Sequence, residues 1–112
     1  MAVHWAEDLA RRALEARGGR TLASNVRVRG GELDLVMDDA GTVVFVEVRQ
    51  RRGGVAGGAA ESLDARKQAR VRRAASAWLA RHGRHEDAVR FDALLVEGEG
   101  ARARLRHVPD AF

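Results

Sequence analysis

The segment of residues 31–52 constrains the fold more than any other part of the chain. It contains two apolar runs, at residues 33–37 and 43–48, separated by the short sequence DDAG. Runs rich in Val and Phe that are broken by Asp and Gly predict a β-hairpin. Side chains alternate between the two faces of a strand, so we expect Glu32, Asp34 and Val36 to share one face.

Glu47 interrupts the second apolar run, with Val46 and Val48 on either side. A lone carboxylate in such a strand is costly to bury unless a cation or a hydrogen-bond donor compensates it. Alternation places Glu47 and Arg49 on one face of this strand. Acids on adjacent strands, Asp34 and Glu47, can meet around one metal ion, and this pair is the candidate site.

Length and composition predict one globular domain that spans residues 1–112. The hydrophobic content is 46% and the charged content 32%, which fits a folded chain of 112 residues. The chain has no cysteine, which excludes disulfides, thiolate metal ligands and cysteine nucleophiles. No apolar run approaches the length of a membrane span, and the N-terminus lacks the apolar core of a signal peptide. We therefore expect a cytoplasmic protein with no membrane contact.

The positive charge is carried almost entirely by arginine. The formal charge is +4, and the 20 basic residues are 19 arginines and one lysine, Lys67. The guanidinium fork binds phosphate in a bidentate manner, so the composition suits a nucleic-acid backbone. Charge dispersed over the surface is the alternative, and composition alone does not separate the two.

Helical spacing of apolar residues predicts a first helix over residues 4–17, which ends at Gly18-Gly19. Glu7 lies at the edge of its apolar stripe, where it either approaches the acid pair or remains a solvated carboxylate. The alternating segment 20–29 predicts a strand, and Gly30-Gly31 a tight reversal into the hairpin.

Residues 51–61 predict a basic, glycine-rich loop that closes on a partner or serves as a linker. Ser62 or Glu61 is the expected cap of a second helix that runs to about His82. Lys67 lies on the apolar stripe of this helix and therefore faces the sheet. Apolar runs at residues 91–96 and 103–108 predict two further strands. The order of helix, three-strand meander, helix and two strands predicts an α/β fold around a mixed central sheet.

An acid on the second strand followed by Glu-x-basic on the third resembles the PD-(D/E)xK metal-nuclease superfamily. More closely, the chain resembles the bacterial YraN-like family, whose fold is similar to that of archaeal Holliday-junction resolvases. The resembling segments span nearly the whole chain: Ala6-Glu7, Asn25, Arg27, GELDL at residues 31–35, VFVEVR at residues 44–49, Lys67, Arg90-Phe91-Asp92 and Ala111-Phe112. The resemblance implies a restriction-endonuclease-like fold that acts on DNA, including branched DNA, as a homodimer.

The resemblance also implies a site for Mg²⁺ or Mn²⁺. Its ligands would be Asp34, Glu47 and the Val48 carbonyl, with Glu7 or Glu32 acting through water. Arg49 stands where the superfamily has lysine. Arginine stays protonated and cannot act as a base. Arg49 or Lys67 therefore fills the lysine role by stabilising charge on the phosphate.

Three alternatives accompany this nuclease hypothesis, and one of them is a partner-binding scaffold in a larger complex. The acids and Arg49 can form an ion-pair network without metal. The same fold can also be a catalytically weak module that binds nucleic acid. For a nuclease and for a binding module alike, arginines of the loop, the second helix and the first strand are the expected phosphate contacts. They are Arg27, Arg51, Arg52, Arg66, Arg70 and Arg73.

Overall fold

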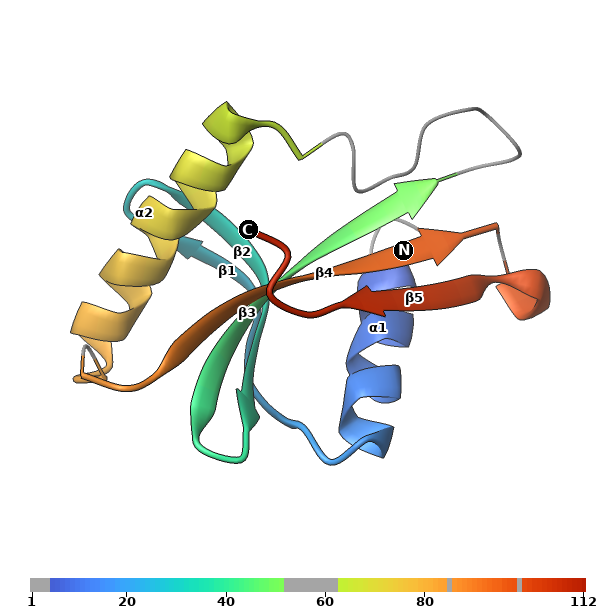
Figure 1. Cartoon of the computed structure of the whole chain (residues 1–112), viewed down its shortest axis with the longest axis horizontal. Helices are drawn as coiled ribbons and strands as arrows, with labels where there is room; N and C mark the ends of the chain where they lie inside the picture. The colour runs from blue at the N-terminus through green and yellow to red at the C-terminus, as the bar shows by residue number, and fades with distance from the viewer. Residues whose placement is uncertain (1–4, 52–62, 85, 99) are drawn as a thin grey trace.

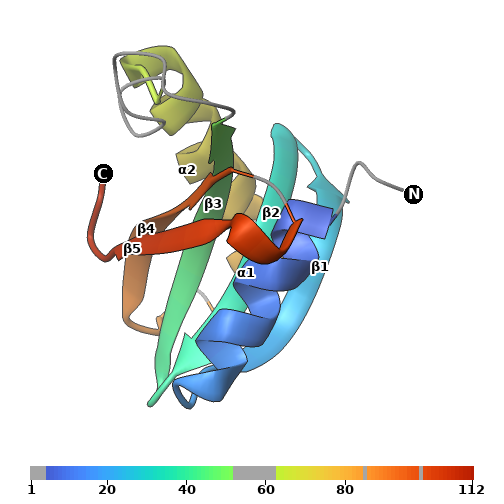
Figure 2. The same cartoon turned by 90° about the vertical axis from the view of Figure 1, so that its right-hand side faces the viewer.

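The computed structural model describes residues 5–51, 63–84, 86–98 and 100–112, and the side chain of Arg51 is not among the described atoms. The chain forms a five-stranded sheet with one α-helix on each face (Figures 1 and 2). In chain order the elements are α1 (Trp5–Ala16), β1 (Arg20–Val28), β2 (Gly31–Asp39), β3 (Thr42–Arg51), α2 (Ala65–Arg81), β4 (Val89–Glu97), the short 3-10 helix η3 (Gly100–Arg102) and β5 (Arg104–Val108). Within the described ranges, no helix has the length and apolar character needed to cross a membrane.

The sheet is mixed, as the sequence predicted. Its strands lie in the order β1-β2-β3-β4-β5. The first three form an antiparallel meander, β3 and β4 are parallel, and β5 returns antiparallel to β4. Parallel neighbours need a long crossover connection, and α2 is the helix of that crossover.

Two apolar clusters hold the helices to the sheet. The α2-side cluster joins Val71, Trp78 and other residues of α2 to β1, β2 and β3, including Phe45. The α1-side cluster joins Ala10 and Leu14 of α1 to the opposite face of β2, β3 and β4. The central strand β3 contributes to both clusters, which explains why its sequence is apolar on both faces.

The turn between β2 and β3 is a two-residue loop, Ala40-Gly41. Both residues have positive φ, 50° and 96°. Two positive φ values match the twist of a β-hairpin. The backbone N–H of Gly41 also donates to the Asp38 carboxylate at 2.9 Å. The acidic and glycine residues of the DDAG segment therefore make the turn that the sequence predicted.

The start of α2 differs from the prediction. We expected Ser62 or Glu61 as its cap, but the helix begins at Ala65 and its cap is Asp64, whose Oδ1 accepts from the Lys67 N–H at 2.9 Å. Ser62 and Glu61 lie outside the described residues. An aspartate at this position satisfies an N–H group that the first helical turn leaves without a partner.

Replacing Asp64 with Ala should lower the free energy of unfolding by about 1 kcal/mol, the usual cost of losing a helix cap. Urea unfolding followed by circular dichroism measures the change. An Asp64→Asn variant retains an acceptor and should stay close to the wild type. Equal losses in both variants would show that the side-chain acceptor does not cap the helix.

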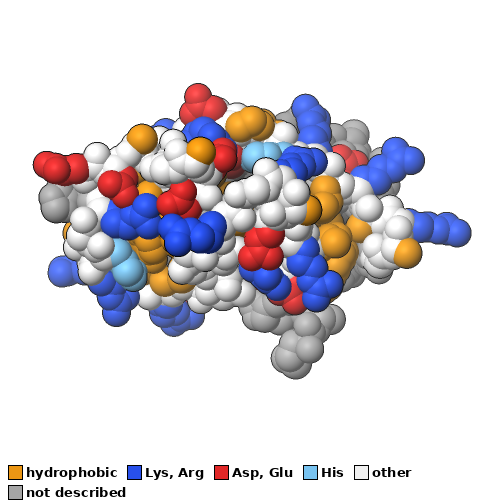
Figure 3. Space-filling model, turned by 90° about the horizontal axis from the view of Figure 1, so that it is seen from below, with side chains coloured by type: hydrophobic (Ala, Val, Ile, Leu, Met, Phe, Trp, Pro, Cys, Tyr) orange, Lys and Arg blue, Asp and Glu red, His pale blue; other side chains and the backbone are white. Residues whose placement is uncertain are grey.

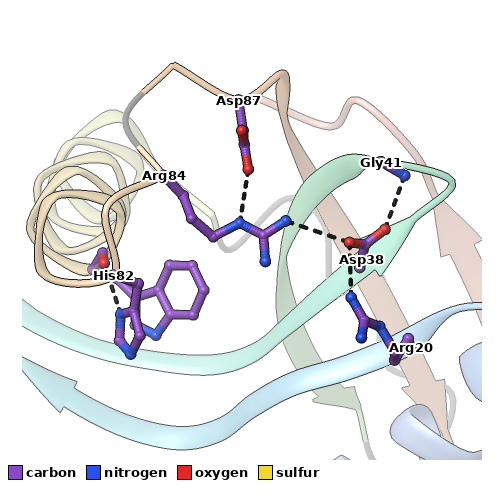
Figure 4. Close-up of polar contacts among 7 residues, drawn as sticks. Arg20, Asp38, Gly41, His82, Arg84 and Asp87 are labelled. Atoms are coloured by element: carbon purple, nitrogen blue, oxygen red, sulfur yellow. Dashed lines mark hydrogen bonds and ion pairs between the residues drawn. The ribbon is translucent and has the colours of Figure 1, made fainter.

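Charged side chains at the hairpin end of the molecule are paired with one another. Figure 3, which views this end from below, shows acidic and basic groups interleaved rather than one continuous basic area. Arg84 follows α2 and bridges Asp87 at 2.7 Å and Asp38 at 3.3 Å, while Arg20 of β1 reaches Asp38 at 3.4 Å (Figure 4). These pairs tie the end of α2 to the β2–β3 hairpin.

Candidate functional site

Glu47 is a buried carboxylate in the middle of β3. It is 4% exposed and lies on the α2 face of the sheet, since alternation places it with Phe45 of the α2-side cluster. Two cations approach the same oxygen, Oε1: Lys67 Nζ of α2 at 3.2 Å and Arg49 Nη1 at 3.6 Å. The prediction that Lys67 faces the sheet is therefore confirmed, and its ammonium reaches the buried acid.

The surroundings of Glu47 oppose its ionisation. Burial raises the pKa of the Glu47 carboxyl above its usual value, and the negative charge of Asp34 raises it further. Lys67 and Arg49 act in the opposite direction without cancelling the effect. Two carboxylates that repel each other at a partly buried site favour a divalent cation there.

Asp34 is held where the pairing of β2 with β3 ends. The ladder between these strands runs from Asp39↔Thr42 to Leu35↔Val46. One residue beyond it, Oδ2 of Asp34 accepts a hydrogen bond from the Val48 N–H at 2.9 Å. Where the two strands separate, the Asp34 carboxylate thus takes the place of a backbone carbonyl as the acceptor for the Val48 N–H. This hydrogen bond holds the carboxylate beside β3.

Strict alternation along β2 was predicted for Glu32, Asp34 and Val36, and this prediction is wrong. Leu33 and Val36 both pack in the α2-side cluster, although residues three apart in a regular strand point to opposite faces. The strand therefore changes face once between these two residues. Asp34 lies at this change, so period-2 counting cannot assign it to either face.

An open pocket of about 300 Å³ borders this part of the site. It is lined by Glu7, Asn25, Arg27, Glu32, Leu33 and Asp34. Glu7 of α1 and Glu32 of β2 thus face the same hollow as Asp34. Across the part of the chain that the structure describes, no three His, Asp or Glu side chains gather closely enough to hold a metal. A direct site would therefore consist of Asp34, Glu47 and a backbone oxygen, with the other carboxylates reaching it through water.

The predicted phosphate contacts lie partly on α2. Arg66, Arg70 and Arg73 are exposed and follow one stripe of the helix at spacings of four and three residues. The β1–β2 turn packs beside this stripe, since a Cβ on Gly30 would lie 3.5 Å from the Arg73 Cβ (Figure 1). Arg27 is exposed on β1 and pairs with Glu32 at 2.6 Å. Arg52 and the side chain of Arg51 lie outside the described residues.

A second buried acid, Asp92 of β4, was named in the sequence analysis only as part of a resembling segment and was not singled out as a buried charge. It is 0% exposed and accepts from Arg90 at 2.8 and 2.9 Å and from the Asp110 backbone N–H at 2.9 Å. His107 Nε2 of β5 lies 2.7 Å from its Oδ2. An acid inside the apolar run FDALLV is the same signal that singled out Glu47, so the sequence did contain a clue to it.

Comparison with known proteins places the chain in a family. Residues 6–96 match the family described as "Uncharacterised protein family UPF0102". The chain belongs to the UPF0102 family. The match includes the residues of the candidate site, which are Glu7, Glu32, Asp34, Glu47, Val48, Arg49 and Lys67, but it ends before His107.

UPF0102 relatives resemble this chain over most of its length. A UPF0102 protein of Halorhodospira halophila is 50% identical over 107 residues, covering 96% of this chain and 83% of that protein. The UPF0102 protein YraN of Salmonella arizonae is 53% identical over 94 residues, covering 82% and 72%. A third relative, from Frankia casuarinae, is 47% identical over 107 residues, covering 95% and 91%. The resemblance to YraN-like proteins is therefore confirmed.

Proposed function

We propose that this chain is a metal-dependent endonuclease that hydrolyses DNA phosphodiester bonds with Mg²⁺ or Mn²⁺. The supporting observation is the buried Glu47 carboxylate, which experiences the charge of Asp34 and contacts both Lys67 and Arg49. The fold is compatible with the restriction-endonuclease-like architecture of the superfamily that the sequence resembles. We therefore propose the restriction-endonuclease-like fold together with the activity.

The oxygen atoms at the site suit a hard cation. Mg²⁺ prefers carboxylate and carbonyl oxygens and retains several waters. Asp34 and Glu47 supply two carboxylates whose mutual repulsion a divalent ion would relieve. The Val48 carbonyl is the third proposed ligand. Its amide N–H faces Asp34, and both polar groups of a residue in an extended strand point to the same edge.

The residues around the pair account for the other requirements of phosphoryl hydrolysis. A divalent ion at this site supplies a Lewis acid and a more acidic bound water. Lys67 and Arg49 place two positive charges beside Glu47, where they can stabilise negative charge that develops on the phosphate. Arg49 cannot accept a proton, so it contributes charge only. Glu7 and Glu32 line the adjoining pocket and can orient water there.

Supercoiled plasmid DNA should be nicked by the purified protein in Mg²⁺ or Mn²⁺, and EDTA should abolish the nicking. An Asp34→Asn variant should cut about 10²-fold more slowly, because a neutral oxygen binds metal and opposes charge less well. Asparagine can still accept from the Val48 N–H, so the fold should be retained. Asp87→Asn, at the hairpin end, is the matched control and should cut like the wild type.

The finer parts of the proposal are branched DNA as the substrate and a homodimer as the working unit, both implied by the resemblance to junction resolvases. A four-way junction compared with a linear duplex of the same sequence tests the first. Sedimentation with and without the junction tests the second. Equal cleavage of junction and duplex would remove the branched-DNA part while leaving the nuclease proposal intact.

The second candidate function is nucleic-acid binding without cleavage. The observation in its favour is the exposed stripe of Arg66, Arg70 and Arg73 on α2. Such a module would bind DNA equally well in EDTA, with an affinity that falls steeply as salt rises because counterions are released from the phosphates. Binding in EDTA together with no nicking in either metal would replace the nuclease proposal with this one.

A further inference from the structure

Asn25 has an unusual backbone conformation inside β1. Its φ is +51°, in the left-handed region that residues other than glycine rarely adopt. The register places Asn25 opposite Asp34, because the pairs on either side are Ser24↔Leu35 and Val26↔Leu33. Asn25 also lines the pocket that contains Asp34. A rare conformation thus faces a proposed metal ligand across the ladder.

Both strands change face at this point. In β1, Ala23 and Val26 both pack against the α2-side cluster, although they are three residues apart and the register shift of this strand lies earlier, between Thr21 and Ala23. In β2, Val36 and Leu33 do the same. These residues pair across the ladder, Ala23 with Val36 and Val26 with Leu33, so the two changes occur side by side. Of the described residues in this stretch, Asn25 is the one with a left-handed backbone.

The Asp34 carboxylate also departs from the direction expected in a regular strand. In a regular strand its side chain would stand roughly perpendicular to the sheet. Here its Oδ2 instead accepts from the Val48 N–H of the neighbouring strand at 2.9 Å. In that position the negative charge of Asp34 raises the pKa of Glu47. Glu47 lies two residues after Phe45 in β3 and shares its α2 face.

We infer that the left-handed conformation of Asn25 is the positioning device that turns Asp34 toward Val48 and Glu47. Asparagine suits this position because it adopts the left-handed region at a lower cost than other residues with a Cβ, alanine included. Asn25 is a positioning residue and takes no part in the chemistry. Its importance for metal binding rests on the proposed function, but the geometric inference does not.

Two substitutions separate the backbone conformation from the carboxamide. Asn25→Gly removes the side chain and permits positive φ, whereas Asn25→Ala removes it and disfavours positive φ. Amide hydrogen exchange of Val48, followed by NMR, reports directly on the hydrogen bond to Asp34. The reference is the Val43 amide in the same strand, which donates to the Ala88 carbonyl at 2.8 Å.

Exchange at Val48, relative to Val43, should rise about tenfold in Asn25→Ala, the size expected from the penalty of a left-handed alanine. It should stay within about twofold of the wild type in Asn25→Gly, which accepts this conformation freely. If the alanine variant does not fold, Asn25→Ser replaces it with the same expectation, since serine also lacks the tolerance of asparagine.

Wild-type protection in the alanine or serine variant would overturn the inference. So would equal loss of protection in the glycine variant, because the carboxamide rather than the backbone would then hold Asp34. This measurement requires neither metal nor DNA. A wild-type protein that cuts no DNA would therefore refute the proposed function and leave this test of Asn25 unaffected.

Discussion

Replacing Glu47 with Met should reduce metal-dependent nicking by at least about 10³-fold, since the variant loses both a metal ligand and its charge. The same substitution should leave the fold intact or stabilise it by about 1–2 kcal/mol. Nicking rates with Mn²⁺ and urea unfolding of the same preparations measure the two effects. Loss of activity combined with retained stability is the result that distinguishes a functional acid from a structural one.

The predicted effect of Glu47→Met on stability follows from the burial of Glu47 and the partial exposure of Lys67 and Arg49. Glu47 is 4% exposed in a strand that is otherwise apolar, so its charge is expensive to bury. The side chains of Lys67 and Arg49 are 32% and 25% exposed. Both cations can therefore turn to water when the acid is removed. Methionine has a similar length and adapts to irregular apolar space.

Glu47→Gln is the matched control, because it preserves shape and a neutral oxygen. Its nicking rate should lie between those of the wild type and the methionine variant. If Glu47→Met instead lost about 3–5 kcal/mol, the cost of breaking a buried ion pair, the acid would belong to a structural network. Nicking at the wild-type rate in the methionine variant would remove Glu47 from the proposed metal site.

Replacing the other buried acid, Asp92, is expected to destabilise the protein, in contrast to Glu47. Asp92→Asn should lower the free energy of unfolding by about 3 kcal/mol, because four donor contacts converge on a carboxylate that is 0% exposed. Arg90 donates to both carboxylate oxygens of Asp92, so in either orientation the NH₂ group of an asparagine would face an Arg90 N–H and leave two donors opposed. The midpoint of urea unfolding measures the loss.

The contribution of Asp92 should depend on pH. Burial alone would raise the pKa of Asp92, but hydrogen bonds from Arg90, from the Asp110 amide and from His107 outweigh it and hold the pKa below its usual value. A group whose pKa is lowered by folding contributes stability above its unfolded pKa of about 3.9. This contribution is lost as the pH falls through the lower value of the folded state.

The difference in unfolding free energy between the wild type and Asp92→Asn should therefore shrink as the pH falls below about 4. Asp87→Asn serves as the control, since Asp87 forms an exposed pair with Arg84 and should contribute little. If the difference in unfolding free energy instead grew below about pH 4, Asp92 would be protonated in the native state and would not act as a charged acceptor.

Much of the site followed from the periodicity of the sequence. The hairpin and the apolar stripe of α2, which turns Lys67 toward the sheet, were predicted because each depends on residues that are close along the chain. The contact of Lys67 with Glu47 joins residues 20 positions apart and is visible only in the structure. The helix cap was missed by two residues or more. Asp64, Ser62 and Glu61 are near neighbours in sequence, and only the path of the chain into α2 selects among them.

Long-range contacts explain the remaining differences. Asp92 lies 15 residues from His107 and 18 from Asp110, and the three meet only because β5 returns antiparallel to β4 in a register that the strand patterns do not specify. Asp34 was placed by counting alternate faces, and that rule fails where Asn25 takes a positive φ. A single left-handed residue leaves no trace in hydrophobic periodicity.

The sequence by itself determined the order of the elements, the mixed sheet, an acid within the apolar run of the central strand and a lysine on the helix face toward the sheet. These follow from short-range patterns of apolar and polar residues, which specify the type of each element and its buried face. Only the tertiary structure decided how Asp34 reaches Val48 and how Asp92 is satisfied. Both depend on hydrogen bonds between strands, and such partners are chosen by the packing of the whole sheet.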